Sequence, residues 1–153
     1  SYVYLIKVGE IRSTFLRNYV YHVSKPIDLK LLSKELKGII GTHDFSAFRS
    51  SQCSAKDPVK TILKASFEER DNLICIEFSA NAFLHNMIRI LIGTLVEIST
   101  NADSEYTITD IISSKNRALA GKTAPANGLY FLGAKYKDIQ NTNIPFKKFF
   151  DSL

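Results

Sequence analysis

The sequence has 153 residues, of which 45% are hydrophobic and 23% charged, a balance typical of one folded domain that excludes a disordered chain. The net charge of +5 permits a polyanionic partner without demanding one. The longest apolar stretch, residues 87–98, is interrupted by Arg89, Thr94 and Glu97 and is too short to span a bilayer. Two cysteines are too few for a disulfide framework or a metal knuckle, and no signal-peptide pattern is present. These features predict a cytoplasmic protein with reduced thiols.

The hydrophobic pattern predicts strands and helices along most of the chain. The predicted strands, each rich in apolar and β-branched residues, span residues 2–8, 18–23, 61–69, 73–80 and 129–136. The predicted helices, each with an apolar stripe, span residues 28–40, 83–99 and 108–114. Asp28 is the expected N-cap of the first helix and Gly41 its C′ residue, and Thr107 or Thr109 caps the last helix. Residues 42–56 and 121–128 are expected to form loops, the first with a possible helical turn.

The order of these elements predicts an α+β fold. Residues 69–72 lie between two strands and give a hairpin signal. Hairpins followed by helices favour an antiparallel or mixed sheet with helices on one side. No repeat or shift in composition divides the chain, so we expect one domain portion over residues 1–136 and a C-terminal tail over residues 137–153, whose aromatic residues could pack back on the sheet.

Arg89 poses the sharpest question, because it lies within the least polar predicted helix. His85 precedes it by one turn and Gly93 follows by one turn, so the three residues are expected to form a polar groove on one helix face. Burying an arginine without a partner costs several kcal/mol. Arg89 therefore either extends to solvent or pairs with a carboxylate or a phosphate, and the sequence leaves both interpretations open.

The segment from Gly41 to Lys56 mixes aromatic and basic residues, which suits single-stranded or loop RNA. Its candidate RNA-binding residues are His43, Phe45, Arg49 and Lys56. A well-packed turn is an equally good interpretation, with Phe45 in the core, His43 bonded to nearby backbone and Arg49 solvated. Other chemistries have little support, because the sequence has no phosphate-binding glycine loop and its three histidines lack metal-ligand spacing.

Four motifs, taken together, resemble one enzyme family. They are YVY at residues 2–4, GTHDFSAFR at 41–49, ANAFLHNMIRILIG at 80–93 and APANGLY at 124–130. Their order and spacing are similar to those of the tRNA pseudouridine synthase A family. The resemblance covers residues 1–136 and is most specific at residues 81–89.

The resemblance implies an enzyme that isomerises uridine to pseudouridine at tRNA positions 38 to 40, in the anticodon arm. It implies a mixed, mostly antiparallel sheet flanked by helices, no cofactor and no metal, and a homodimer that clasps tRNA. By the same resemblance, Tyr2 stacks on the flipped uracil, Arg89 pairs with a catalytic aspartate and Leu129 lines the uracil pocket. The residues expected to contact RNA are His43, Phe45, Arg49, Lys56 and His85.

The sequence departs from the family at the nucleophile. The family's aspartate lies in a Gly-Arg-Thr-Asp-x-Gly-Val-His motif, which these 153 residues do not contain, and Asp44 belongs to a different motif. We therefore expect the chain to be the C-terminal catalytic portion of the enzyme, inactive by itself, with the absent aspartate as the partner of Arg89. A strand beginning directly after Ser1 agrees with this expectation. The alternatives are a non-catalytic RNA-binding module and an α/β interaction domain with no RNA role.

Overall fold

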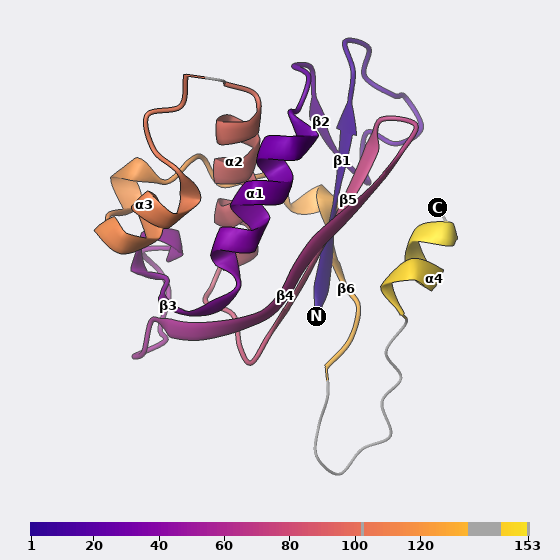
Figure 1. Ribbon diagram of the computed structural model, residues 1–153. Helices are drawn as coiled ribbons and strands as arrows, with labels where there is room; N and C mark the ends of the chain where they lie inside the picture. Colours follow the sequence, from indigo (N-terminus) through magenta and orange to yellow (C-terminus); the bar gives the residue numbers. More distant parts are fainter. Residues whose placement is uncertain (102, 135–144, 153) are drawn as a thin grey trace.

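The computed structural model describes residues 1–101, 103–134 and 145–152 (Figure 1). The described residues form a six-stranded sheet of order β2-β1-β5-β4-β3, with β6 also pairing with β1. The strands are β1 (Tyr2–Val8), β2 (Tyr21–Val23), β3 (Gly41–Asp44), β4 (Val59–Arg70), β5 (Leu73–Ala80) and β6 (Leu129–Phe131). The pairing is antiparallel except between β1 and β2. The prediction of a mixed, mostly antiparallel sheet is therefore confirmed.

Strand β1 is the centre of the site described below, because three other strands pair with it. One edge pairs with β5. The other edge is shared, since β2 runs parallel to residues 6–8 and β6 runs antiparallel to residues 2–4. This second pairing sets Leu129 opposite Tyr4 and Phe131 opposite Tyr2. The start of β6 is thereby fixed beside the first residues of the chain.

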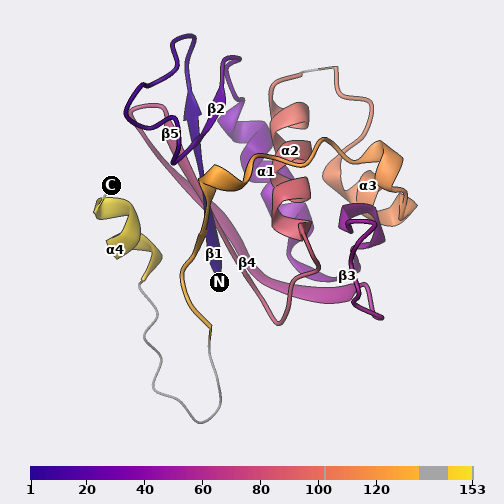
Figure 2. The ribbon, with the colours of Figure 1, turned by 180° about the vertical axis from the view of Figure 1, so that it is seen from behind.

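Helices lie on both faces of the sheet. Helices α1 (Leu29–Ile39), α2 (Met87–Ser99) and α3 (Ile108–Ser114) cover one face, and α4 (Phe146–Asp151) lies on the other (Figures 1 and 2). Three 3₁₀ turns occupy Ser46–Phe48, Arg117–Leu119 and Ala126–Gly128. The expectation of helices on one side is wrong for α4, whose position the local sequence pattern could not give.

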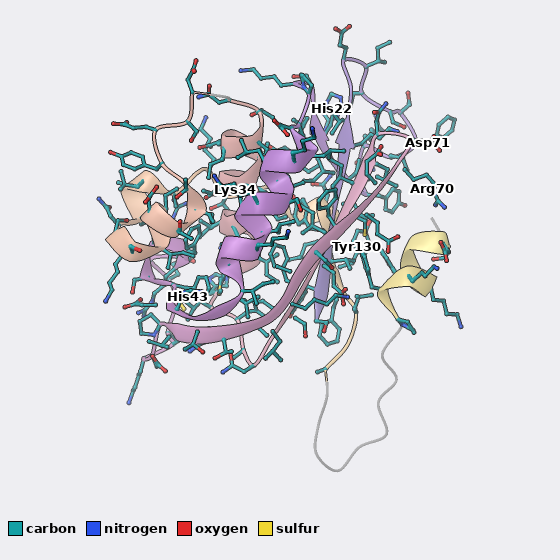
Figure 3. The ribbon with its side chains drawn as sticks, in the orientation of Figure 1. His22, Lys34, His43, Arg70, Asp71 and Tyr130 are labelled. Atoms are coloured by element: carbon teal, nitrogen blue, oxygen red, sulfur yellow. The ribbon has the colours of Figure 1, made fainter. Side chains whose placement is uncertain are left out.

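Each face of the sheet carries its own hydrophobic core. On β1, Tyr4 and Ile6 point toward α1 and α2, whereas Val3 and Leu5 point to the opposite face. Aromatic rings of α4 pack against this second core, and the ring of Phe149 lies 6.0 Å from that of Tyr130. Figure 3 shows Tyr130 on the α4 side of the sheet. The tail thus packs back on the sheet at α4, and residues 135–144 lie outside the described part.

Local signals explain the elements that the sequence predicts well. Asp28 caps α1 by accepting hydrogen bonds from the backbone N–H groups of Lys30 and Leu31. Gly41 follows the end of α1 with a φ of +119°, which an L side chain rarely adopts. Thr107 caps α3 in a reciprocal capping box with Asp110. The hairpin between β4 and β5 turns through two residues of left-handed φ, as a type I′ turn requires.

Several elements differ from the prediction, and strand β2 begins at Tyr21 rather than residue 18. The expected loop after Gly41 contains β3, a short strand that depends on pairing with β4. Helix α2 begins at Met87 rather than residue 83, because Asn86 has a left-handed φ of 60° that interrupts the helical backbone. Strand β6 ends at Phe131 rather than residue 136. In the described ranges, none of the helices combines the length and the apolar character needed to cross a membrane.

The segment from Gly121 to Ala124, which we call the connector, lies directly on α2. A Cβ atom built on Gly93 would stand 1.7 Å from the carbonyl oxygen of Lys122. Three connector N–H groups bond to α2, at 2.8 Å to Oγ1 of Thr94, 3.0 Å to Oε1 of Glu97 and 3.0 Å to the carbonyl oxygen of Arg89. The backbone approach at Gly93 therefore admits no side chain.

We predict that Gly93→Ala lowers the free energy of unfolding by about 3 kcal/mol, because the new methyl group must displace the connector backbone. Urea unfolding followed by circular dichroism measures this change. Gly38→Ala in α1 is the matched control, since its Cβ would meet side-chain methyl groups of Thr109 and Ile108 instead of backbone. Equal stability of the two variants would contradict the close approach.

Candidate active site

A cavity of about 350 Å³ opens where the amino end of α2 meets β1 and β6. Its walls come from the strand β1, the turn that leads into α2, the first residues of α2 and the start of β6. The lining residues are Tyr2, Phe83, Leu84, His85, Asn86, Met87, Ile88, Arg89 and Leu129. Four residues singled out in the sequence, Tyr2, His85, Arg89 and Leu129, are thus brought together from three separate motifs.

Tyr2 forms an aromatic wall of the cavity. Its ring makes edge contacts with Phe83, at a centroid distance of 5.4 Å, and with Phe131, at 5.2 Å. Tyr4 lies on the same face of β1 but is fully buried, and its hydroxyl donates to the carbonyl oxygen of Pro125 at 2.5 Å. Burial raises the pKa of Tyr4. Of the two tyrosines of the first motif, Tyr2 is therefore the one that can meet a ligand.

Arg89 is held at two of its three guanidinium nitrogens. Nε donates to the carbonyl oxygen of Ala124 at 2.7 Å, and Nη1 donates to Oδ1 of Asn86 at 3.1 Å. Among the described residues, none accepts a hydrogen bond from Nη2 and no carboxylate forms an ion pair with Arg89. The guanidinium therefore presents a positive charge and a free donor at the edge of the cavity.

The position of Leu129 depends on a close contact just before it. A Cβ atom on Gly128 would stand 2.8 Å from both the carbonyl oxygen of Leu5 and a ring carbon of Tyr4. The glycine lets the chain pass against β1 and enter β6 at Leu129. Leu129 is half-buried and supplies an apolar wall opposite the polar groups of α2.

His85 lines the cavity and contacts the loop that follows the 3₁₀ turn Ser46–Phe48. His85 is exposed and precedes α2, and its carbonyl oxygen accepts a hydrogen bond from the N–H of Ser50 at 3.4 Å. Arg49 donates through Nη2 to the carbonyl oxygen of Cys53 at 2.8 Å, which ties this loop together. The basic loop predicted from sequence therefore lies beside the cavity.

The prediction of an open polar groove on α2 is wrong. Arg89 and Gly93 do share a face, but the connector fills the space over Gly93. His85 does not belong to the helix, because the left-handed backbone of Asn86 separates it from α2. The connector thus covers the Gly93 end of this helix face, and the Arg89 end opens into the cavity.

Among the candidate RNA-binding residues, Phe45 needs correction. Its ring is fully buried and packs against Phe48, so it belongs to the core, as the alternative interpretation held. His43 bonds through Nε2 to the carbonyl oxygen of Ile40, at 3.1 Å, and also contacts Phe45. Lys56 is exposed and does not line the cavity.

The described residues contain no group of three or more His, Cys, Asp or Glu side chains that could hold a metal ion. Figure 3 shows His22 and His43 at opposite ends of the molecule. The charged chemistry of the cavity therefore rests on Arg89.

Sequence reasoning missed three contributors to the site: Asn86, Phe83 and Ala124. Phe83 and Asn86 lie within the most specific motif, yet their roles depend on the turn that replaces the predicted first helical turn. Ala124 acts through its backbone, which leaves no signal in the side-chain pattern.

Comparisons with known proteins place the chain in a family. The family model described as tRNA pseudouridine synthase matches residues 36–137. The chain is 43% identical over 135 residues to the tRNA pseudouridine synthase A of Acetivibrio thermocellus, covering 88% of this chain and 55% of that protein. It is 40% identical over 136 residues to the enzyme of the same name from Geobacillus sp., with 89% and 55% coverage.

The chain therefore belongs to the tRNA pseudouridine synthase family. The matched region includes the turn before α2, the amino end of α2 and the start of β6, which together build most of the cavity. The chain spans about half the length of the curated relatives it matches.

We predict that an alkylating reagent labels Cys53 before Cys75 in the folded protein. Hydrogen bonds from the backbone N–H groups of His85 and Ala55 lower the pKa of Cys53, whereas burial raises the pKa of Cys75 to about 12. The thiolate is the reactive form, so Cys53 labelling slows as the pH falls. Mass spectrometry after iodoacetamide treatment measures both sites, with Cys53→Ser as the control. Faster labelling of Cys75 would contradict this arrangement.

Proposed function

We propose that the protein to which this chain belongs isomerises uridine to pseudouridine in the anticodon arm of tRNA, at positions 38 to 40. The observation that carries the proposal is the cavity in which Tyr2, Arg89 and Leu129 meet. Membership of the family and the names of the relatives support a tRNA substrate. The choice of the anticodon arm and a homodimer follow from the resemblance described above, and a cytoplasmic location follows from the cysteine count.

The cavity suits a uracil that has left its stack. The reaction breaks the bond from ribose C1′ to N1 of the base and joins C1′ to C5. The proton on C5 is lost and N1 gains one, so the enzyme must reach both edges of the ring. Flipping the nucleotide out of the RNA exposes them. Tyr2 offers a surface on which the ring stacks, and Leu129 and Phe83 exclude water around it.

The nucleophile comes from outside these 153 residues. No Asp or Glu is among the described residues that line the cavity, whereas Nη2 of Arg89 is available to receive a carboxylate. A guanidinium within a few ångströms stabilises the ionised carboxylate and lowers its pKa. The segment that supplies it belongs to the part of the relatives that this chain does not span. Arg89 is then both the anchor and the electrostatic activator of the nucleophile.

We expect no pseudouridine from the isolated 153-residue chain, because it lacks the carboxylate. Release of tritium from tRNA labelled at C5 of uridine measures the reaction directly, since the C5 proton must leave. The full-length protein under the same conditions is the positive control. Turnover by the isolated chain would place the nucleophile within it and overturn this assignment.

In the full-length protein, we expect Arg89→Ala to lower kcat on the order of 100-fold or more, because the carboxylate loses its charged partner. The affinity for tRNA, measured by filter retention, changes much less, since many contacts contribute to the binding free energy. Arg12→Ala is the control, because this exposed arginine does not line the cavity. Near-normal turnover in Arg89→Ala would refute its role. A full-length protein that binds tRNA without turnover would favour the non-catalytic RNA-binding module.

A further inference from the structure

Asn86 adopts an unusual conformation at the entrance to α2. Its φ of 60° and ψ of 6° are left-handed, a region that asparagine enters more readily than most residues with a side chain. An asparagine at this helix position commonly accepts a hydrogen bond from the first helical turn. Asn86 makes no such bond, and its Oδ1 instead accepts from Nη1 of Arg89 at 3.1 Å. The Asn86 side chain therefore holds the Arg89 guanidinium and does not cap the helix.

The guanidinium of Arg89 is fixed because its two hydrogen-bond partners lie on different elements. Ala124 belongs to the connector and accepts from Nε, whereas Asn86 belongs to the turn before α2 and accepts from Nη1. Two bonds at separate nitrogens define the plane of a rigid, planar group. The third nitrogen, Nη2, keeps its protons for a ligand, since no described residue accepts from it. Without Asn86, only the bond at Nε would remain, and the plane could rotate.

We propose that Asn86 is the positioning residue of the site, which orients the Arg89 guanidinium and leaves its charge available for the nucleophilic carboxylate. This inference rests on the proposed function, because it assigns Asn86 a role through Arg89. An amide oxygen accepts a hydrogen bond without carrying a charge. A carboxylate at residue 86 would hold the same nitrogen but would neutralise the guanidinium. The neutral amide oxygen of Asn86 thus orients the Arg89 guanidinium without cancelling its positive charge.

The test uses Asn86→Gly in the full-length protein. Glycine keeps the left-handed backbone but removes the acceptor. We expect kcat for pseudouridine formation to fall about 10-fold to 100-fold, because the reacting groups lose their alignment, while KM for tRNA changes little. The acidic limb of the pH profile moves to higher pH, since a poorly placed cation lowers the pKa of the nucleophile less. The other titratable groups that line the cavity, Tyr2 and His85, are unchanged in the variant.

Asn72→Gly is a matched control. Asn72 has a φ of 61° in the hairpin between β4 and β5, is exposed and does not line the cavity. Its substitution makes the same chemical change in the same backbone conformation, so it should leave kcat and the pH profile unchanged. Thermal unfolding of both variants shows whether a loss of activity follows from a loss of stability. A positioning role requires that Asn86→Gly lose activity at temperatures where both variants are folded.

Asn86→Asp separates the charge from the hydrogen bond. Aspartate also tolerates the left-handed backbone and retains an acceptor oxygen, but it pairs with Arg89. We expect its kcat to fall at least as far as that of Asn86→Gly. Wild-type kcat and pH profile in Asn86→Gly, or wild-type activity in Asn86→Asp, would overturn the inference. Either result, with Arg89→Ala inactive, would leave the proposed function intact, whereas an inactive wild-type protein would refute the proposed function itself.

Discussion

The contact between helix α2 and the connector is the constraint on which the site depends. Residues 121–124 lie along the face of α2 that carries Arg89, Gly93, Thr94 and Glu97, and the Arg89 end of that face also opens into the cavity. The polar residues that interrupt the apolar stretch of the sequence, Arg89, Thr94 and Glu97, each form a hydrogen bond with the connector. Gly93 lets the two backbones meet between them. The four exceptions within the apolar stretch of residues 87–98 therefore hold a second segment of chain against the helix.

Holding the connector has two consequences for the cavity. It brings the carbonyl oxygen of Ala124 to Nε of Arg89, which aims the guanidinium. It also directs the chain toward Gly128 and Leu129, where β6 joins β1 beside Tyr2. The polar and apolar walls of the cavity are therefore coupled through a single segment. A disturbance at Gly93, which does not line the cavity, would reach both walls.

The sequence predicts those parts of the fold that local signals determine. The cap at Asp28, the capping box at Thr107 and the turn at residues 71–72 fix their elements within a few residues. The short strand β3 escapes the prediction, because it exists only through pairing with β4, and β6 begins at the predicted residue but ends earlier, at Phe131. The start of α2 is not predicted, because the hydrophobic pattern of the sequence does not reveal that Asn86 has a left-handed backbone conformation.

The sequence predicts some members of the candidate site but not the others, and not its geometry. Motif resemblance selects Tyr2, Arg89 and Leu129, and the structure places all three around one cavity. The i, i+4 spacing correctly puts Arg89 and Gly93 on one face, but it cannot reveal that a segment some 30 residues later covers that face. Nor could the aromatic pattern decide whether Phe45 contacts RNA or belongs to the core, which only burial settles.

The most direct test of the account is a crystal structure of the full-length protein bound to an anticodon stem-loop RNA. The account predicts a uracil in the cavity, stacked on Tyr2 beside Leu129, with an aspartate carboxylate that is not one of these 153 residues bonded to Nη2 of Arg89. A carboxylate that approaches from another direction, or RNA bound with the cavity filled by protein side chains, would contradict it.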